Sequence, residues 1–140
     1  MKLFLKSITF LGSVYFFIFI VLLTFLLNQT YSLKLFLALL LTWLITFLIR
    51  FFYFKRRPNR KTYKNLFQKL YNSSFPSVHA ARAVVLAYFF SKIYFNIVFV
   101  LGFWLIALLV CYTRIYLKHH YLIDVICGAF FGFLVSVFIL

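Results

Sequence analysis

Long apolar runs separated by short basic segments constrain this chain more than any other feature of its sequence. A helix needs about 20 consecutive apolar residues to cross a bilayer, and most of the runs approach or reach that length. The predicted fold is therefore all-α: a polytopic transmembrane helix bundle of about five spans in one membrane-embedded domain, residues 1–140. The spans are predicted at residues 8–27, 33–54, 79–90, 93–116 and 121–140.

The first of these runs, residues 8–27, is similar in character to the core of a secretory signal peptide. Its apolar core is too long for such a peptide, and no small-x-small cleavage site follows it. We therefore interpret this run as a span that is retained in the protein.

Composition excludes an ordinary soluble domain. Hydrophobic residues make up 66% of the chain, whereas soluble domains are nearer half apolar. Fifteen Lys and Arg residues against one acidic residue give a net charge of +14. Because the basic residues cluster between apolar runs, anionic membrane lipids are the expected partner rather than nucleic acid. Cys111 and Cys127 lie in or beside apolar runs without zinc-binding spacing, and we interpret them as packing residues.

One long polar segment, residues 55–75, interrupts the apolar pattern and carries seven Lys or Arg residues. Apolar residues recur within it at helical spacing, at Tyr63, Leu66, Phe67, Leu70 and Tyr71. This spacing predicts a short amphipathic interfacial helix that lies in the membrane surface. A cap packed over the helix bundle is an alternative that the same pattern allows.

The unusual polar residues are predicted to converge on one membrane face. Consecutive spans cross the membrane in opposite directions. The same side of the membrane therefore holds the ends of the second and fourth spans and the starts of the third and fifth. The polar residues at these ends are Arg50, Arg57, Ser77, His79, Arg114, His120 and Asp124. Their convergence favours an active site over scattered charges that neutralise one another.

Asp124 is the single acidic residue, and it follows His120 by four positions. Residues at i and i+4 share one face of a helix, so these two side chains are expected to hydrogen-bond. The carboxylate would then fix the imidazole tautomer and leave the other ring nitrogen free to act as base or nucleophile. The alternative is a carboxylate that only neutralises nearby Lys and Arg at the membrane surface.

Phosphoryl transfer is the chemistry that suits these residue types. Guanidiniums bind phosphate oxygens in bidentate fashion, and the free N–H groups at the start of the third span form an anion site. One histidine can attack phosphorus while the other protonates the leaving oxygen. A catalytic Mg²⁺ normally needs carboxylate ligands. Because the sequence has only one, the predicted chemistry uses no metal or other cofactor.

Three motifs, in order and spacing, resemble the type 2 phosphatidic acid phosphatase superfamily, which includes lipid phosphatases and vanadium haloperoxidases. The first motif, K-x6-R-P, corresponds to Arg50, six residues and Arg57-Pro58. The second, P-S-G-H, corresponds to Pro76-Ser77-Val78-His79. The third, S-R-x5-H-x3-D, corresponds to Thr113-Arg114, His120 and Asp124. The three motifs together cover about half of the chain and are far more specific than any one alone.

The resemblance implies a role for each matching residue. His120 would be the nucleophile that forms a phosphohistidine, Asp124 would orient it, and His79 would be the general acid. The phosphoryl oxygens would be bound by Arg50, Arg57, Arg114, Ser77 and the backbone N–H of Val78. His119 matches no motif position, and we interpret it as an interfacial residue.

Three positions depart from the family pattern. Arg50 replaces Lys, which keeps the charge and changes the geometry, and Thr113 replaces Ser, which keeps a hydroxyl. Val78 replaces Gly, a residue that permits unusual backbone angles and close approach of a ligand. The valine is therefore expected to narrow the pocket or lower activity. Membrane members of the resembled family typically have six spans, whereas we count five.

The expected function is metal-independent hydrolysis of a membrane-anchored lipid phosphate or diphosphate. Phosphatidate, phosphatidylglycerol phosphate, polyprenyl diphosphate and lipid A phosphates are all compatible with the motifs. One alternative is a catalytically inactive membrane protein that binds anionic lipid, and another is a small transporter. Charges at one face, rather than in the middle of the bilayer, argue against transport.

The chain is expected to be a multi-pass protein of the inner cell membrane, and two arguments disagree about the side of the site. Basic residues concentrate on the face of the site, with only Lys34 and Lys92 on the opposite face. The positive-inside rule then places the site in the cytoplasm. Bacterial relatives in the resembled family often work on the outer side, and part of the charge would serve substrate binding. We therefore prefer the periplasmic side.

Overall fold

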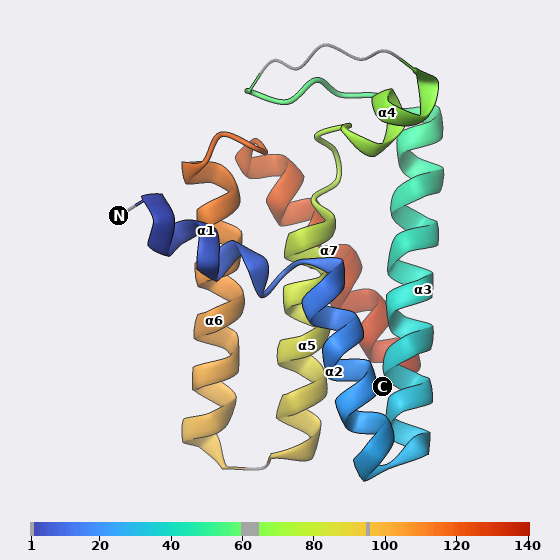
Figure 1. Ribbon diagram of the computed structural model, residues 1–140, viewed down its shortest axis with the longest axis vertical. Helices are drawn as coiled ribbons and strands as arrows, with labels where there is room; N and C mark the ends of the chain where they lie inside the picture. The colour runs from blue at the N-terminus through green and yellow to red at the C-terminus, as the bar shows by residue number, and fades with distance from the viewer. Residues whose placement is uncertain (1, 60–64, 95) are drawn as a thin grey trace.

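The computed structural model describes residues 2–59, 65–94 and 96–140, and all regular secondary structure within these ranges is helical (Figure 1). The helices are α1 Lys2–Phe10, α2 Val14–Leu27, α3 Gln29–Phe52, α4 Leu66–Tyr71, α5 Val78–Ile93, α6 Ile97–Tyr116 and α7 Leu122–Ile139. The predicted all-α fold class is confirmed.

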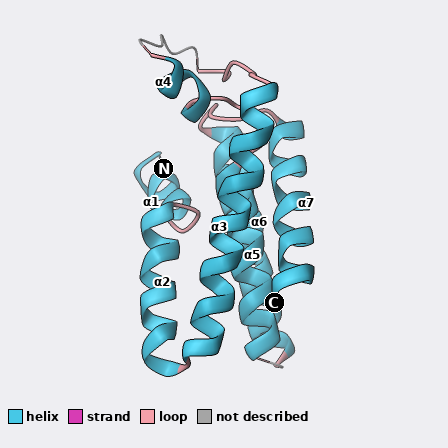
Figure 2. Ribbon diagram, turned by 90° about the vertical axis from the view of Figure 1, so that its right-hand side faces the viewer, coloured by secondary structure: helices cyan, strands magenta, loops and turns pink. Residues whose placement is uncertain are grey.

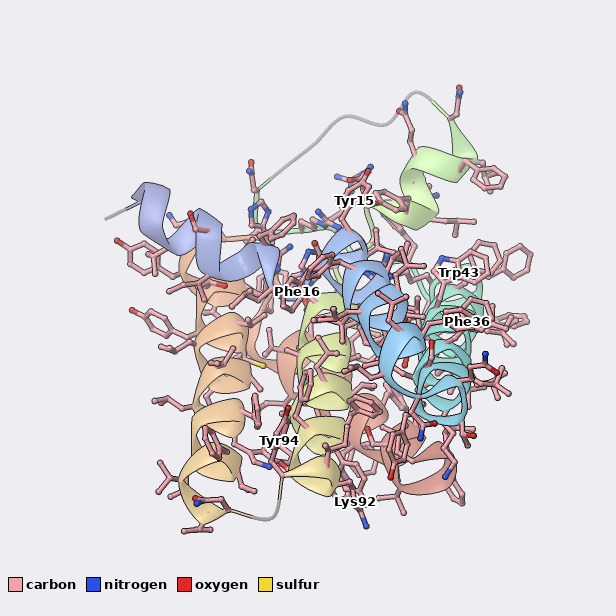
Figure 3. All side chains as sticks on the ribbon, turned by 60° about the horizontal axis from the view of Figure 1, so that its bottom comes forward. Tyr15, Phe16, Phe36, Trp43, Lys92 and Tyr94 are labelled. Atoms are coloured by element: carbon pink, nitrogen blue, oxygen red, sulfur yellow. The ribbon has the colours of Figure 1, made fainter. Side chains whose placement is uncertain are left out.

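A bundle of α2, α3, α5, α6 and α7 forms the body of the protein, with α5 packed against α7, α6 and α3 (Figures 1 and 2). Helices α3, α6 and α7 are long and apolar enough to cross a membrane. Helices α2 and α5 are shorter, with 14 and 16 residues, so the predicted count of five spans is approximate. The outer faces carry exposed apolar side chains, and Figure 3 shows Phe36 and Trp43 of α3 pointing away from the bundle.

Two glycines allow α7 to lie directly against α5. A Cβ at Gly128 would come within 2.3 Å of the carbonyl oxygen of Ser77, and a Cβ at Gly132 would come equally close to that of Ala81. Small residues four positions apart are a usual means of close helix packing in membranes. Because of this contact, the first turn of α7 is held beside the first turn of α5.

The apolar run predicted as the first span, residues 8–27, is divided between two helices. Helix α1 ends at Phe10, and α2 begins after Ser13, whose hydroxyl accepts a hydrogen bond from the N–H of Phe16. Gly12 at the corner lies so close to α5 and α6 that a Cβ would be 3.0 Å from the carbonyl oxygen of His79. The break lets α1 turn and pack across α6 (Figure 1).

The predicted interfacial segment, residues 55–75, is only partly helical where the structure describes it. Tyr63 lies outside the described residues, and α4 contains six residues. Leu70 of α4 is buried, whereas Leu66, Phe67 and Tyr71 are exposed. The helix packs over the end of α3, as the cap alternative predicts, and its other apolar side chains point outward.

Candidate active site

Four helix ends and two loops meet at one end of the bundle. The last turns of α3 and α6 and the first turns of α5 and α7 lie there, next to the segments 53–59 and 72–77 (Figure 1). Six of the seven polar residues selected from the sequence belong to these parts of the chain, and His120 lies in the turn between α6 and α7. Side chains that are distant in sequence are therefore brought into one site, as the alternating directions of the spans require.

His120 is buried in the turn between α6 and α7, with 2% of its surface exposed. Its Nδ1 lies 2.6 Å from the carbonyl oxygen of Ser74. Because a carbonyl can only accept, Nδ1 carries the proton and Nε2 keeps its lone pair. Burial, followed by the positive charges of Arg114 and Arg57, lowers the pKa of His120 to about 2. The imidazole is therefore neutral at physiological pH, which is the state required of a nucleophile.

Asp124 does not hydrogen-bond to His120, so the predicted direct contact is wrong. Its carboxylate is fully buried and binds Lys55 Nζ at 2.6 Å. It also accepts hydrogen bonds from the Ser74 hydroxyl and, at 2.9 Å, from the backbone N–H of Tyr121. The physical reason is that α7 begins only at Leu122. His120 precedes the helix, and the i,i+4 rule does not apply to the pair.

Ser74 joins the two residues instead. Its carbonyl accepts from His120 Nδ1, and its hydroxyl donates to Asp124. The Ser74 side chain is fully buried, and its backbone N–H donates to the carbonyl of Lys55 at 2.7 Å. Asp124 and the imidazole are therefore connected through the 72–77 loop rather than by direct contact.

Lys55 and Ser74 are site residues that sequence reasoning missed. Lys55 was one of seven basic residues in a polar segment, and Ser74 lies outside the matched motifs. The sequence did contain a signal for Lys55, because a buried carboxylate requires a counter-ion. It did not show which of the many Lys and Arg residues is the counter-ion of Asp124. Besides its ion pair, the Lys55 ammonium lies 4.6 Å from the centre of the Tyr121 ring, which adds a cation–π contact.

The three predicted phosphate-binding arginines are held by the chain itself. Arg50 donates to the carbonyls of Tyr71 and Pro76, both at 2.9 Å. Arg57 donates to the same Tyr71 carbonyl at 3.5 Å, and Arg114 donates to the Thr9 hydroxyl of α1 at 3.3 Å. Since the single side-chain carboxylate of the sequence is bound to Lys55, the guanidiniums keep positive charge available for an anion.

The start of α5 carries the next three predicted residues. Ser77 is the N-cap, and its hydroxyl lies 3.5 Å from the N–H of Ala80. Its own backbone N–H donates to the carbonyl of Asp124 at 2.9 Å. Val78 opens the helix, and Lys118 is the one described non-glycine residue with a positive φ. Glycine is therefore not required at position 78 for its backbone angles, although the valine does line a small cavity of about 80 Å³ beside Arg50.

His79 is half-buried in the first turn of α5. Among the described residues none forms a hydrogen bond to its ring, so both nitrogens remain available for a substrate. His119 lies in the same turn as His120, and the backbone N–H groups of both donate to the carbonyl of Arg114 at 3.1 Å. Arg57 and His120 also line an open cavity of about 800 Å³ together with Arg56 and Lys118.

The residues that the structure describes contain no group of three His, Cys, Asp or Glu side chains that could hold a metal ion. The site contains the neutral imidazole of His120, which has one free lone pair, a second imidazole close to it, and several guanidiniums. This set suits attack on a tetrahedral oxyanion such as phosphate.

Comparison with known proteins agrees with this geometry. The profile of the PAP2 superfamily matches residues 31–140. Among solved structures, the crystal structure of Aquifex aeolicus LpxE superposes with a TM-score of 0.81 at 25% sequence identity. The alignment covers 97% of this chain and 82% of that one. No curated protein matches the chain.

Proposed function

The chain belongs to the PAP2 superfamily, and from this premise we propose that it is a phosphatase of membrane-anchored lipid phosphates or diphosphates. The observation that carries the proposal is the state of His120, whose Nδ1 is fixed by the Ser74 carbonyl while guanidiniums surround it. A neutral imidazole with one available lone pair, in a strongly cationic site, is suited to attack an anionic phosphorus centre.

In the proposed first step, His120 Nε2 attacks phosphorus and forms a phosphohistidine. The P–O bond to the lipid breaks, and its electron pair stays on the leaving oxygen, which takes a proton from His79. In the second step, His79 removes a proton from water, and the resulting hydroxide displaces His120 and releases orthophosphate. Arg50, Arg57 and Arg114, together with Ser77 and the N–H of Val78, stabilise the charge on the phosphoryl oxygens in both steps.

The donor set supports a reaction that needs no metal. Magnesium sites are normally built from carboxylates, and Asp124 is the one acidic residue of the sequence. Its carboxylate is buried and engaged by Lys55, Ser74 and Tyr121. The guanidiniums are therefore proposed to carry the charge stabilisation that a metal supplies in other phosphoryl-transfer enzymes.

A lipid-anchored substrate is supported by the position of the site at the end of apolar helices. Phosphatidate, phosphatidylglycerol phosphate, polyprenyl diphosphate and lipid A phosphates all fit this description. We place the protein in the inner membrane with the site on the periplasmic side, as an interpretation of the family resemblance.

A phosphate-release assay with these lipids in mixed micelles, run in EDTA, tests the proposal. His120→Ala is expected to lower kcat at least about a thousandfold, because the nucleophile is lost. The matched variant His119→Ala changes a neighbouring imidazole without removing the nucleophile, and should stay within about twofold of the native rate.

Equal losses in the two variants would mean that the nucleophile is misassigned. A requirement for added Mg²⁺ would contradict the metal-free reaction. Absence of release from every lipid would instead favour a non-catalytic protein that binds anionic lipid.

A further inference from the structure

Arg82 is a buried cation that the mechanism above does not use. It lies on α5, three residues after His79, and only 7% of its surface is exposed. Its Nε is buried without a hydrogen-bond partner, as are those of Arg50, Arg57 and Arg114. Those three arginines hydrogen-bond to the chain through their terminal nitrogens, whereas those of Arg82 form no such bond with a described residue. A buried, charged group in this condition is costly unless a ligand supplies the missing partner.

The surroundings of Arg82 place its charge on the side of the catalytic site. Its stem lines a small apolar cavity with Val14 of α2 and Trp43 of α3, the latter labelled in Figure 3. Side chains on a helix lean toward its N-terminus, which here is the end that carries His79. His79 and Arg82 are three positions apart on α5, so the two side chains share one face of that helix.

The site carries an excess of positive charge that a strongly anionic ligand would neutralise. Arg50, Arg57, Arg82 and Arg114 contribute four positive charges, and the only side-chain carboxylate is neutralised by Lys55. A phosphate monoester carries about −1.5 to −2 at neutral pH. A diphosphate adds about one further negative charge, on the phosphate that remains with the lipid. Four guanidiniums therefore match a diphosphate better than a monophosphate.

We propose that Arg82 binds the leaving phosphate of a lipid diphosphate, and that lipid diphosphates are the preferred substrate class of this protein. The inference rests on the proposed function, because His79 as general acid fixes the side on which the leaving group lies. His120 attacks the terminal phosphorus, and the bond from that phosphorus to the bridging oxygen breaks. The electron pair and a proton from His79 go to the bridging oxygen, and a lipid monophosphate leaves, held by Arg82. Water then hydrolyses the phosphohistidine.

The test compares a polyprenyl diphosphate with the polyprenyl monophosphate of the same chain length, as initial rates in the same nonionic mixed micelles. The native protein should have a higher kcat/KM for the diphosphate. Arg82→Gln, which keeps much of the side-chain volume, should lower kcat/KM for the diphosphate by about 10- to 100-fold, the range for a lost hydrogen bond to a charged group. The same variant should change kcat/KM for the monophosphate by less than about threefold.

Two further variants control for charge and structure. Arg82→Lys keeps the charge without the planar donor pair and should recover part of the diphosphate rate. Lys92→Gln removes a cation at the far end of the same helix, where the ammonium lies 5.4 Å from the centre of the Tyr88 ring. It should leave the preference between the two substrates unchanged.

A binding measurement keeps the inference testable if Arg82→Gln fails to fold. In His120→Ala, which cannot turn over, inorganic pyrophosphate should bind more tightly than inorganic phosphate. Any of three results would overturn the inference and leave the proposed phosphatase activity standing. They are equal binding of the two anions, equal loss of both activities in Arg82→Gln, and a preference of the native protein for the monophosphate. Release from phosphatidate but from neither polyprenyl lipid would also overturn the inference, whereas absence of release from every lipid would overturn the proposed function itself.

Discussion

Ser74 shows how a single side chain can connect residues that the sequence separates. The motifs identified the imidazole and the carboxylate, and the structure places both at the site. Their connection was not predictable, because it runs through a loop residue 46 positions before His120 and 50 before Asp124. Helical spacing describes contacts within one helix only, and both contacts of Ser74 are tertiary. The same limit applies to Lys55, which is 69 positions from its ion-pair partner.

Ser74→Ala is expected to lower kcat by about 10- to 100-fold with little change in KM, because it removes a hydrogen bond to a buried carboxylate. Ser73→Ala is the matched control, since the Ser73 hydroxyl contacts the backbone of Lys55 and Phe75 and not Asp124. Steady-state kinetics on one lipid substrate would compare them. If both variants lose the same activity, the hydroxyl of Ser74 has no specific role in positioning His120.

The sequence predicted the approximate positions of most helices but neither their number nor their ends, because the described residues form seven helices where five spans and one interfacial helix were expected. The second span, predicted at residues 33–54, begins earlier, as α3 at Gln29, because Asn28 accepts hydrogen bonds from the N–H groups of Thr30 and Tyr31. The fourth span begins after Asn96 for the same reason. The corner at Gly12 was also missed, since apolar composition continues across it and its cause is a contact with α5.

Gly128→Ala is expected to destabilise the protein by about 1–3 kcal/mol or more, because the added Cβ would overlap the Ser77 carbonyl and force α7 away from α5. Since Ser77 and Asp124 are joined across this contact, phosphate release should fall as well. Gly102→Ala on α6 is the control, because a Cβ there meets no atom within 4 Å. It should be neutral or stabilising by up to about 1 kcal/mol.

Thermal unfolding in detergent, combined with the phosphate-release assay, would measure both glycine variants. Similar stability of Gly128→Ala and Gly102→Ala would show that the α5–α7 contact can relax without cost.

For the molecule as a whole, the sequence predicted that distant spans bring their polar ends to one face, and the fold has this arrangement. It did not predict that, among the residues the structure describes, three helices are long and apolar enough to cross a membrane. The orientation of the protein in its membrane is decided by charge and biogenesis. The described cations at the site end, among them Lys55, Arg57 and Lys118, favour the cytoplasm by the positive-inside rule, in conflict with the proposed periplasmic site.

Cysteine labelling in intact cells resolves this conflict. In a background without Cys111 and Cys127, Asn65→Cys places a thiol at the site end and Thr30→Cys places one at the opposite end, both at exposed positions. A membrane-impermeant maleimide is expected to label Asn65→Cys from outside and to label Thr30→Cys only after permeabilisation. The reverse pattern would place the site in the cytoplasm.

The ion pair between Lys55 and Asp124 has a consequence for the end of each catalytic cycle. With its one carboxylate neutralised, the chamber contains no side chain that repels orthophosphate once hydrolysis is complete. We therefore expect orthophosphate to leave by exchange with other anions, such as the headgroups of neighbouring lipids or a fresh substrate molecule. Turnover should then rise with the anionic lipid content of the surrounding membrane.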